Sequence, residues 1–156
     1  MPKVNKTVDE RMTQADKDSV AKMISNGYFN TKAGRSSLFP ILWKPYVYDK
    51  EKIKLISTSI NDSFLLIGKH IGKSFKTSLL QDKLNERLVL LNIPALIIQG
   101  DYDPLPLSSA EINHQVLKGS KLVVLNNCGH FPFIEKQEEF TKIVDDFLQS
   151  LSQKID

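Results

Sequence analysis

Two short, unbroken apolar runs late in the chain constrain its fold more than any other feature. Residues 95–98 (Ala-Leu-Ile-Ile) lie between Pro94 and Gly100, and residues 121–125 (Lys-Leu-Val-Val-Leu) contain the second run. Runs of this length, bounded by turn residues, are typical of strands that are covered on both faces. The segment between them has helical spacing, so the order strand–helix–strand predicts a right-handed parallel crossover and an α/β fold.

A helical pattern follows each of these strands. After the first strand, Ser108 and Glu111 stand at the spacing of a capping box and predict a helix that Gly119 ends. After the second strand, the apolar residues among 140–151 form the stripe of an amphipathic C-terminal helix. Strands and helices therefore alternate in this part of the chain.

The first half of the chain shows mostly helical spacing. Helices are predicted at residues 7–26, 59–71 and 78–91. Thr7 and Glu10 have the spacing of a capping box in the first of these, and Gly27 follows as a stop. Residues 28–50 are rich in aromatic side chains and poorly periodic, which indicates an irregular layer that covers another part of the molecule.

Composition excludes several classes of protein. With 41% hydrophobic and 25% charged residues, the 156-residue chain is neither disordered nor unusual, and one cysteine excludes a disulfide framework. No apolar run approaches the ~20 residues that cross a bilayer, and the N-terminus lacks the apolar core of a signal peptide. We therefore expect a soluble, cytoplasmic protein without a membrane partner. The lysines are scattered without interleaved aromatic residues, so nucleic acid is not an expected partner.

Neither a cofactor nor a metal ion is expected from the sequence. Residues 68–74 resemble a phosphate-binding loop, but three residues instead of four separate the two glycines. The three histidines have no additional ligands at convergent spacing. His70 and His114 are interpreted as surface residues.

The loops that follow the two strands carry the side chains that can take part in catalysis. In parallel sheets, reacting groups gather at the carboxyl ends of strands, and here these ends lead into residues 100–104 and 126–130. The first loop contains two aspartates, and the second contains a cysteine and a histidine. A carboxylate and an imidazole that meet at one sheet edge supply two of the three members of a nucleophile–base–acid triad.

At this point the sequence resembles the C-terminal part of an α/β-hydrolase. The resemblance rests on Ile-Pro at 93–94 before the strand, Gly-x-x-Asp at 100–103, Cys-Gly-His-Phe-Pro at 128–132, Glu135 and the final amphipathic helix. It covers residues 78–156 and is closest in character to proline-iminopeptidase-like members. Residues 1–77 resemble only the helical cap that covers the substrate pocket in this family, so two segments are expected: 1–77 and 78–156.

The resemblance implies roles for particular residues. Asp103 matches the triad acid and His130 matches the triad base, whereas Asp101 is the weaker candidate for the acid. Gln137 stands where the family usually has a proline, which does not affect the triad. Cys128 invites a cysteine–histidine pair, but a small buried residue at a strand end is the favoured interpretation. Glu135 is expected to cap or precede the C-terminal helix, and a role behind the site stays open.

The nucleophile of the family is missing from the sequence. Its serine stands in a Gly-x-Ser-x-Gly turn between a strand and a helix. Residues 34–38 and 72–76 begin like this motif, but each lacks the second glycine, and the glycine motif of the oxyanion hole is absent too. These features precede the cap in the family, so the chain is expected to be the second half of a hydrolase and inactive alone.

The expected reaction is hydrolysis of a small-molecule ester or amide, or of a peptide, through a serine acyl-enzyme. The expected macromolecular partner is a complementary N-terminal half or a second copy of the chain. Two alternatives stay open: a non-catalytic interaction module derived from a hydrolase fold, and a small complete α/β binding domain. Trp43, Tyr46 and Tyr48 either line a pocket under the cap or pack the cap against the body.

Overall fold

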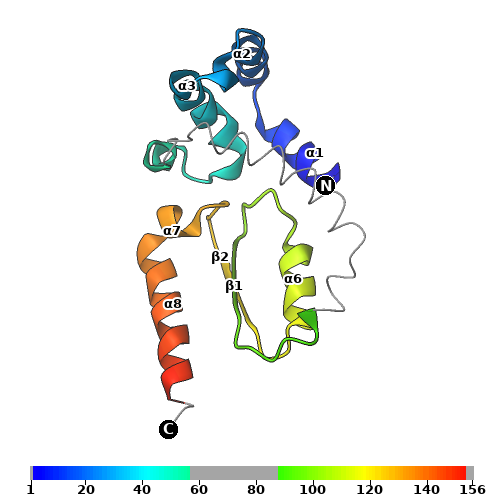
Figure 1. Cartoon of the computed structure of the whole chain (residues 1–156), viewed down its shortest axis with the longest axis vertical. Helices are drawn as coiled ribbons and strands as arrows, with labels where there is room; N and C mark the ends of the chain where they lie inside the picture. The colour runs from blue at the N-terminus through cyan, green and yellow to red at the C-terminus, as the bar shows by residue number, and fades with distance from the viewer. Residues whose placement is uncertain (1, 57–87, 154–156) are drawn as a thin grey trace.

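Two parallel strands form the centre of the C-terminal part of the molecule. The computed structural model describes residues 2–56 and 88–153 (Figure 1). β1 (Leu96–Gly100) pairs with β2 (Lys121–Leu125), with Leu96 opposite Lys121 and Gly100 opposite Leu125. The predicted parallel pair is confirmed, and the second strand has the predicted boundaries.

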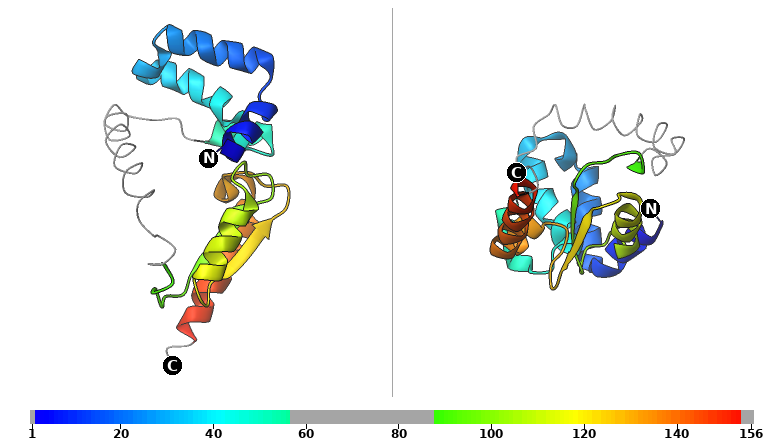
Figure 2. Two further views of the ribbon diagram at one scale, coloured as in Figure 1. Left: turned by 90° about the vertical axis from the view of Figure 1, so that its right-hand side faces the viewer. Right: turned by 90° about the horizontal axis from the view of Figure 1, so that it is seen from below.

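Helices lie on both faces of this strand pair. α6 (Leu107–Val116) contacts both strands, and α8 (Gln137–Ser152) lies on the opposite face (Figure 2). The C-terminal helix is confirmed, but Ser108 is not a cap: α6 begins after Pro106, without a side-chain cap. Gly119 has a φ of 80° in the turn before β2, a conformation that favours glycine.

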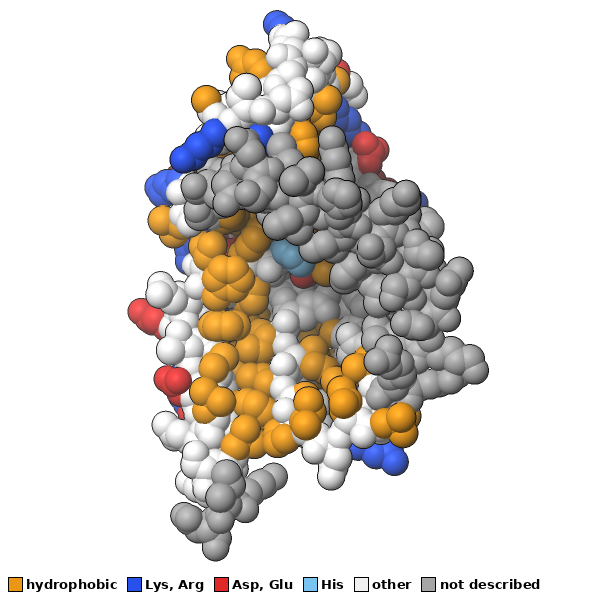
Figure 3. All heavy atoms as spheres, viewed as in Figure 1, with side chains coloured by type: hydrophobic (Ala, Val, Ile, Leu, Met, Phe, Trp, Pro, Cys, Tyr) orange, Lys and Arg blue, Asp and Glu red, His pale blue; other side chains and the backbone are white. Residues whose placement is uncertain are grey.

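The strands are less covered than their sequence predicts. β1 side chains are half-buried before Gly100, and Val124 in β2 is 37% exposed. Within the described residues each strand has only one neighbour in the sheet, so apolar side chains remain accessible. Figure 3 shows hydrophobic side chains gathered over the part of the molecule that holds the strands and α8.

The predicted helix at 7–26 is wrong as a single element. Two helices, α1 (Pro2–Arg11) and α2 (Gln14–Ser25), replace it, and Thr13 caps the second: its Oγ1 accepts a hydrogen bond from the Asp16 N–H at 3.1 Å. Because Thr13 has extended backbone angles, the first helix cannot continue through it. The stop at Gly27, with a φ of 76°, is confirmed.

Residues 28–50 are more regular than expected. Between a 3₁₀ turn at Tyr28–Asn30 and further 3₁₀ turns at Lys44–Tyr46 and Lys50–Leu55 lies α3 (Lys32–Trp43), a twelve-residue helix that contains Pro40. A helix is unexpected here because Gly34 and Pro40 are both unfavourable in a helix interior. The helix persists because Leu38 and Phe39 beside the proline are buried, and their packing outweighs the lost backbone hydrogen bond.

This N-terminal segment packs against the loop side of the sheet. Val47, Ile53 and Ile56 form a buried cluster with Phe131 and Ile134, which flank or belong to the short helix α7 (Pro132–Glu135). The segment that resembles a cap therefore covers the carboxyl edge of the strands (Figure 2). Several predictions concern residues outside those that the structure describes: the helix at 59–71, most of the helix at 78–91, the loop at 68–74, His70 and the boundary at residues 77/78.

Within residues 2–56 and 88–153, no helix is both long and apolar enough to cross a membrane.

Candidate active site

The loops after β1 and β2 are held together by backbone hydrogen bonds. The Asp101 N–H donates to the Leu125 carbonyl at 3.0 Å, and the Tyr102 N–H donates to the Cys128 carbonyl at 2.9 Å. Gly100 makes this approach possible, because a Cβ there would lie 2.1 Å from the Cys128 carbonyl oxygen. The sequence rule that parallel neighbours share one edge thus places both loops side by side.

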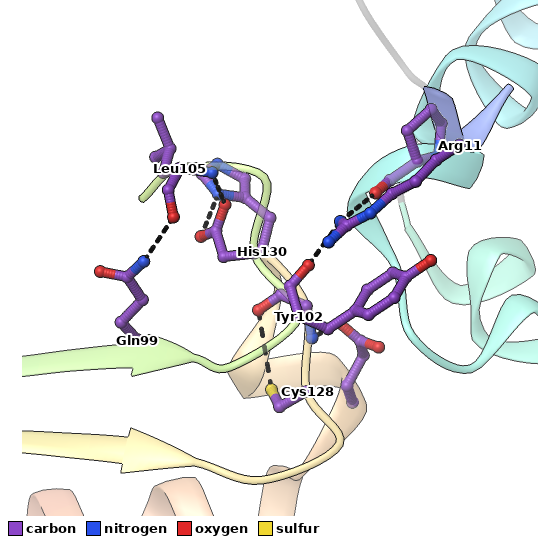
Figure 4. Close-up of polar contacts among 10 residues, drawn as sticks. Arg11, Gln99, Tyr102, Leu105, Cys128 and His130 are labelled. Carbon is purple, nitrogen blue, oxygen red and sulfur yellow. Dashed lines mark hydrogen bonds and ion pairs between the residues drawn. The ribbon is translucent and has the colours of Figure 1, made fainter. Parts of the chain in front are cut away.

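Asp103 and His130 meet at this edge, as the sequence predicts. His130 Nδ1 lies 2.8 Å from Asp103 Oδ2, and the other carboxylate oxygen accepts the Leu105 N–H at 2.8 Å (Figure 4). The side chain of Asp103 is 8% exposed and that of His130 is 38% exposed. Since Nδ1 faces the carboxylate, Nε2 remains as the ring nitrogen for proton transfer.

The hydrogen bond to Asp103 raises the pKa of His130 above its ordinary value, and burial of the ring opposes this rise. The folded-state pKa therefore exceeds the unfolded-state value of about 6.5. The ion pair stabilises the fold fully below that pH, and its contribution is lost as the pH rises through the folded-state pKa. A general base must be neutral, so the basic form of His130 is populated above the raised pKa.

Replacing Asp103 with asparagine is expected to lower the pKa of His130 to its ordinary value or below, because only the effect of burial remains. The pH dependence of the ¹⁵N shifts of the imidazole ring measures this change. Asp101→Asn is the matched control, since Asp101 contacts the backbone of the second loop instead of the histidine. Equal histidine titrations in the wild type and Asp103→Asn would contradict the pairing.

Asp101 and Cys128 brace the loops instead of joining the pair. Asp101 Oδ1 accepts the Cys128 N–H at 3.2 Å. The Cys128 side chain is fully buried, and burial raises the pKa of its thiol to about 12. Because the thiolate is the nucleophilic form of cysteine, this environment disfavours a cysteine nucleophile.

Aromatic side chains surround the histidine. Tyr46 and Phe131 contact the ring of His130 edge-on, with ring centroids 5.7 and 5.3 Å away. Trp43 lies against both of these aromatic rings, and its buried Nε1 has no hydrogen-bond partner among the residues that the structure describes. Tyr48 does not belong to this group, because its ring packs on Tyr102 at 5.4 Å.

Arg11 and Glu135 make tertiary contacts that the sequence did not predict. Arg11 at the end of α1 lies 3.7 Å above the ring centre of Tyr102 and donates to the carbonyls of Tyr102 and Pro45 at 2.6 and 2.9 Å (Figure 4). Glu135 precedes α8 as predicted, but its carboxylate accepts hydrogen bonds from backbone groups on both sides of the site. Except for Gly129, which is six positions from Glu135, these partners are 34 to 91 positions away, so helical periodicity carried no signal for the contacts.

No three His, Cys, Asp or Glu side chains converge in a metal-binding arrangement within the part of the chain that the structure describes.

A parallel strand pair, flanking helices and an aspartate–histidine pair after the two strands define the C-terminal part of an α/β-hydrolase, and the chain belongs to that family. The family model described as TAP-like protein matches residues 75–154, about half of the chain. The fold agrees with the structure of 2-hydroxy-6-oxo-6-phenylhexa-2,4-dienoate hydrolase from Rhodococcus sp. strain RHA1. That match has a TM-score of 0.56 at 21% identity, and covers 72% of this chain and 44% of the other.

Three curated relatives match shorter stretches of the chain. Proline iminopeptidase of Saccharolobus solfataricus is 28% identical over 68 residues, which are 44% of this chain and 22% of the relative. The pimeloyl-[acyl-carrier protein] methyl ester esterase of Neisseria meningitidis is 34% identical over 62 residues (39% and 24%). Monoacylglycerol lipase abhd6-B of Xenopus laevis is 36% identical over 69 residues (44% and 20%). The chain thus matches less than a quarter of the length of each of these relatives.

Proposed function

We propose that this chain supplies the acid and the base of a serine hydrolase that cleaves an ester, amide or peptide bond. The observation that carries the proposal is the 2.8 Å contact between His130 Nδ1 and Asp103 Oδ2, at the carboxyl ends of adjacent parallel strands. Among the relatives are a peptidase, an esterase and a lipase by name, and all three reactions transfer an acyl group to water.

In the proposed mechanism, His130 Nε2 accepts the proton of a serine hydroxyl as that oxygen attacks the substrate carbonyl. The imidazolium then donates this proton to the leaving group, and an acyl-enzyme remains. A water molecule enters, loses a proton to His130 and attacks the acyl carbon. The bond to the serine Oγ then breaks, the imidazolium returns its proton to that oxygen, and the acid and the free serine are released. Asp103 keeps the ring in the required tautomer and stabilises its charged form.

We propose that the serine comes from a segment that the sequence does not contain. Of the two partial motifs, residues 34–38 lie inside α3, where the hydroxyls of Ser36 and Ser37 donate to carbonyls of the preceding helical turn. A helix interior does not present a nucleophile as a strand-to-helix turn does. Residues 72–76 lie outside the described residues.

The exposed apolar side chains beside the strands support a complementary half as the partner. Ile93, Val124 and Leu148 are 55%, 37% and 53% exposed, and Figure 3 shows hydrophobic side chains over this part of the molecule. A strand edge and apolar surface of this kind favour pairing with further strands and helices. The alternative partner for this apolar surface is a second copy of the chain.

A fusion tests the proposed function. The N-terminal portion of the Saccharolobus proline iminopeptidase, ending before its cap, is joined to Met1. The fusion is expected to hydrolyse a p-nitrophenyl ester or prolyl p-nitroanilide, and the chain alone is expected to hydrolyse neither. The control replaces the nucleophilic serine of the archaeal portion with alanine. A folded fusion without hydrolysis would favour a non-catalytic interaction module.

A further inference from the structure

Glu135 is a buried carboxylate that accepts hydrogen bonds from the backbone of two segments, residues 48–49 and the nearby Gly129. Glu135 is only 4% exposed to solvent. Oε1 accepts the Gly129 N–H at 2.8 Å, and Oε2 accepts the N–H groups of Tyr48 and Asp49 at 2.7 and 3.2 Å. Hydrogen bonds to the charged form satisfy a carboxylate that would otherwise be costly to bury.

These contacts enclose the backbone on which the histidine stands. Gly129 directly precedes His130, and the His130 N–H donates to the Tyr46 carbonyl at 2.7 Å. A Cβ on Gly129 would lie 2.1 Å from that carbonyl oxygen and 2.8 Å from Glu135 Oε1. The histidine loop is therefore held between residues 46–49 on one side and Glu135 on the other.

The arrangement exceeds what a helix cap requires. A cap satisfies donors of its own first turn, whereas the partners of Glu135 lie 6, 86 and 87 positions away. An amide in place of the carboxylate would turn its NH₂ group toward one set of these N–H donors, and at least one donor would lose its acceptor.

We propose that Glu135 is a positioning residue for His130: its carboxylate joins the cap-like residues 46–49 to the histidine loop, so that the ring meets Asp103. The inference rests on the proposed function, in which His130 is the base. It adds that the Glu135 carboxylate keeps residues 46–49 and the histidine loop in a fixed position relative to each other. Loss of the carboxylate then disturbs the ring even though Glu135 does not contact the ring.

The test is a titration of His130 by ¹⁵N NMR in the full chain. Glu135→Gln and Glu135→Asp are expected to shift the midpoint downward toward the ordinary value of about 6.5, and to remove the exchange protection of the Gly129 amide. Aspartate retains the charge but is one methylene shorter. A shift in both variants therefore reports positioning, whereas a shift in Glu135→Gln alone would indicate a direct charge effect and overturn the proposal.

Glu138→Gln is the matched control, because Glu138 is an exposed glutamate in the first turn of α8 and its titration curve is expected to equal that of the wild type. Folded Glu135 variants with a wild-type histidine titration overturn the inference. They leave the proposed function intact as long as Asp103→Asn still lowers the midpoint. If Asp103→Asn has no effect either, the acid–base pair itself is refuted.

A milder pair of variants decides the question if the Glu135 variants do not fold. Asp49→Pro removes one N–H that donates to Glu135, and Asp49→Ala removes only the side chain that caps the following 3₁₀ turn. A lower midpoint in Asp49→Pro than in Asp49→Ala supports the positioning role. Equal midpoints in the two variants overturn it.

Discussion

Replacing His130 with alanine is expected to reduce the kcat of the active fusion by on the order of 10⁶-fold, with little change in KM. The proton of the serine then has no acceptor, and the leaving group has no donor, so both halves of the reaction lose their catalyst. Substrate binding changes little because the interaction is made in the transition state. Initial rates over a range of substrate concentrations measure both constants.

His114→Ala is the matched control for this prediction. His114 is an exposed histidine of α6 whose Nδ1 lies 2.8 Å from Ser120 Oγ, next to the amino end of β2 and not at the carboxyl ends that carry the site. Its variant is expected to retain the kcat of the unmodified fusion. A His130→Ala fusion that keeps its kcat within tenfold of the unmodified protein would show that another group is the base.

Replacing Gly100 with alanine is expected to lower the free energy of unfolding by about 3 kcal/mol and to separate the acid from the base. The new Cβ would lie 2.1 Å from the Cys128 carbonyl oxygen and 2.4 Å from that of Gly129. These are backbone atoms of the neighbouring loop, so no side-chain rotation relieves the overlap. Urea unfolding measures the loss, and the His130 titration reports the separation.

Gly119→Ala distinguishes crowding from backbone strain. Gly119 has a φ of 80°, but in the described part of the chain no atom beyond its two sequence neighbours lies within 4 Å of the position of its Cβ. Alanine there costs about 1–2 kcal/mol through the left-handed conformation alone and leaves the histidine titration unchanged. Equal losses of stability in the two variants, with the titration of His130 unaffected in both, would contradict the crowding at Gly100.

The parts of the fold set by local pattern were predictable from the sequence. The run at 121–125 is a strand with those boundaries, because apolar β-branched residues between turn signals have one favourable arrangement in a parallel pair. The strand order predicted that a carboxylate of residues 100–104 and His130 meet, because both loops follow strands of that pair. The resemblance to α/β-hydrolases, and not the strand order, singled out Asp103 instead of Asp101, and the 2.8 Å contact agrees with that choice.

The features that depend on tertiary contacts were not predictable in this way. Thr13 separates two helices and caps the second, and the helical spacing over residues 7–26 did not predict this interruption. Gly34 is unfavourable inside a helix, but α3 requires a glycine there because the Tyr28 carbonyl oxygen would lie 2.2 Å from a Cβ. The partners of Arg11 and Glu135 lie as far as 91 and 87 positions away, beyond any local pattern.

Labelling with a fluorophosphonate probe tests most directly whether the nucleophile lies outside this chain. An activated serine displaces fluoride from the probe and retains the phosphonyl group on its Oγ. The chain alone is expected to remain unlabelled, and the fusion is expected to carry one adduct, which peptide mass spectrometry places on the serine of the archaeal portion. A covalent adduct on any residue from 1 to 156 of the chain alone would contradict the proposal that it supplies only the acid and the base.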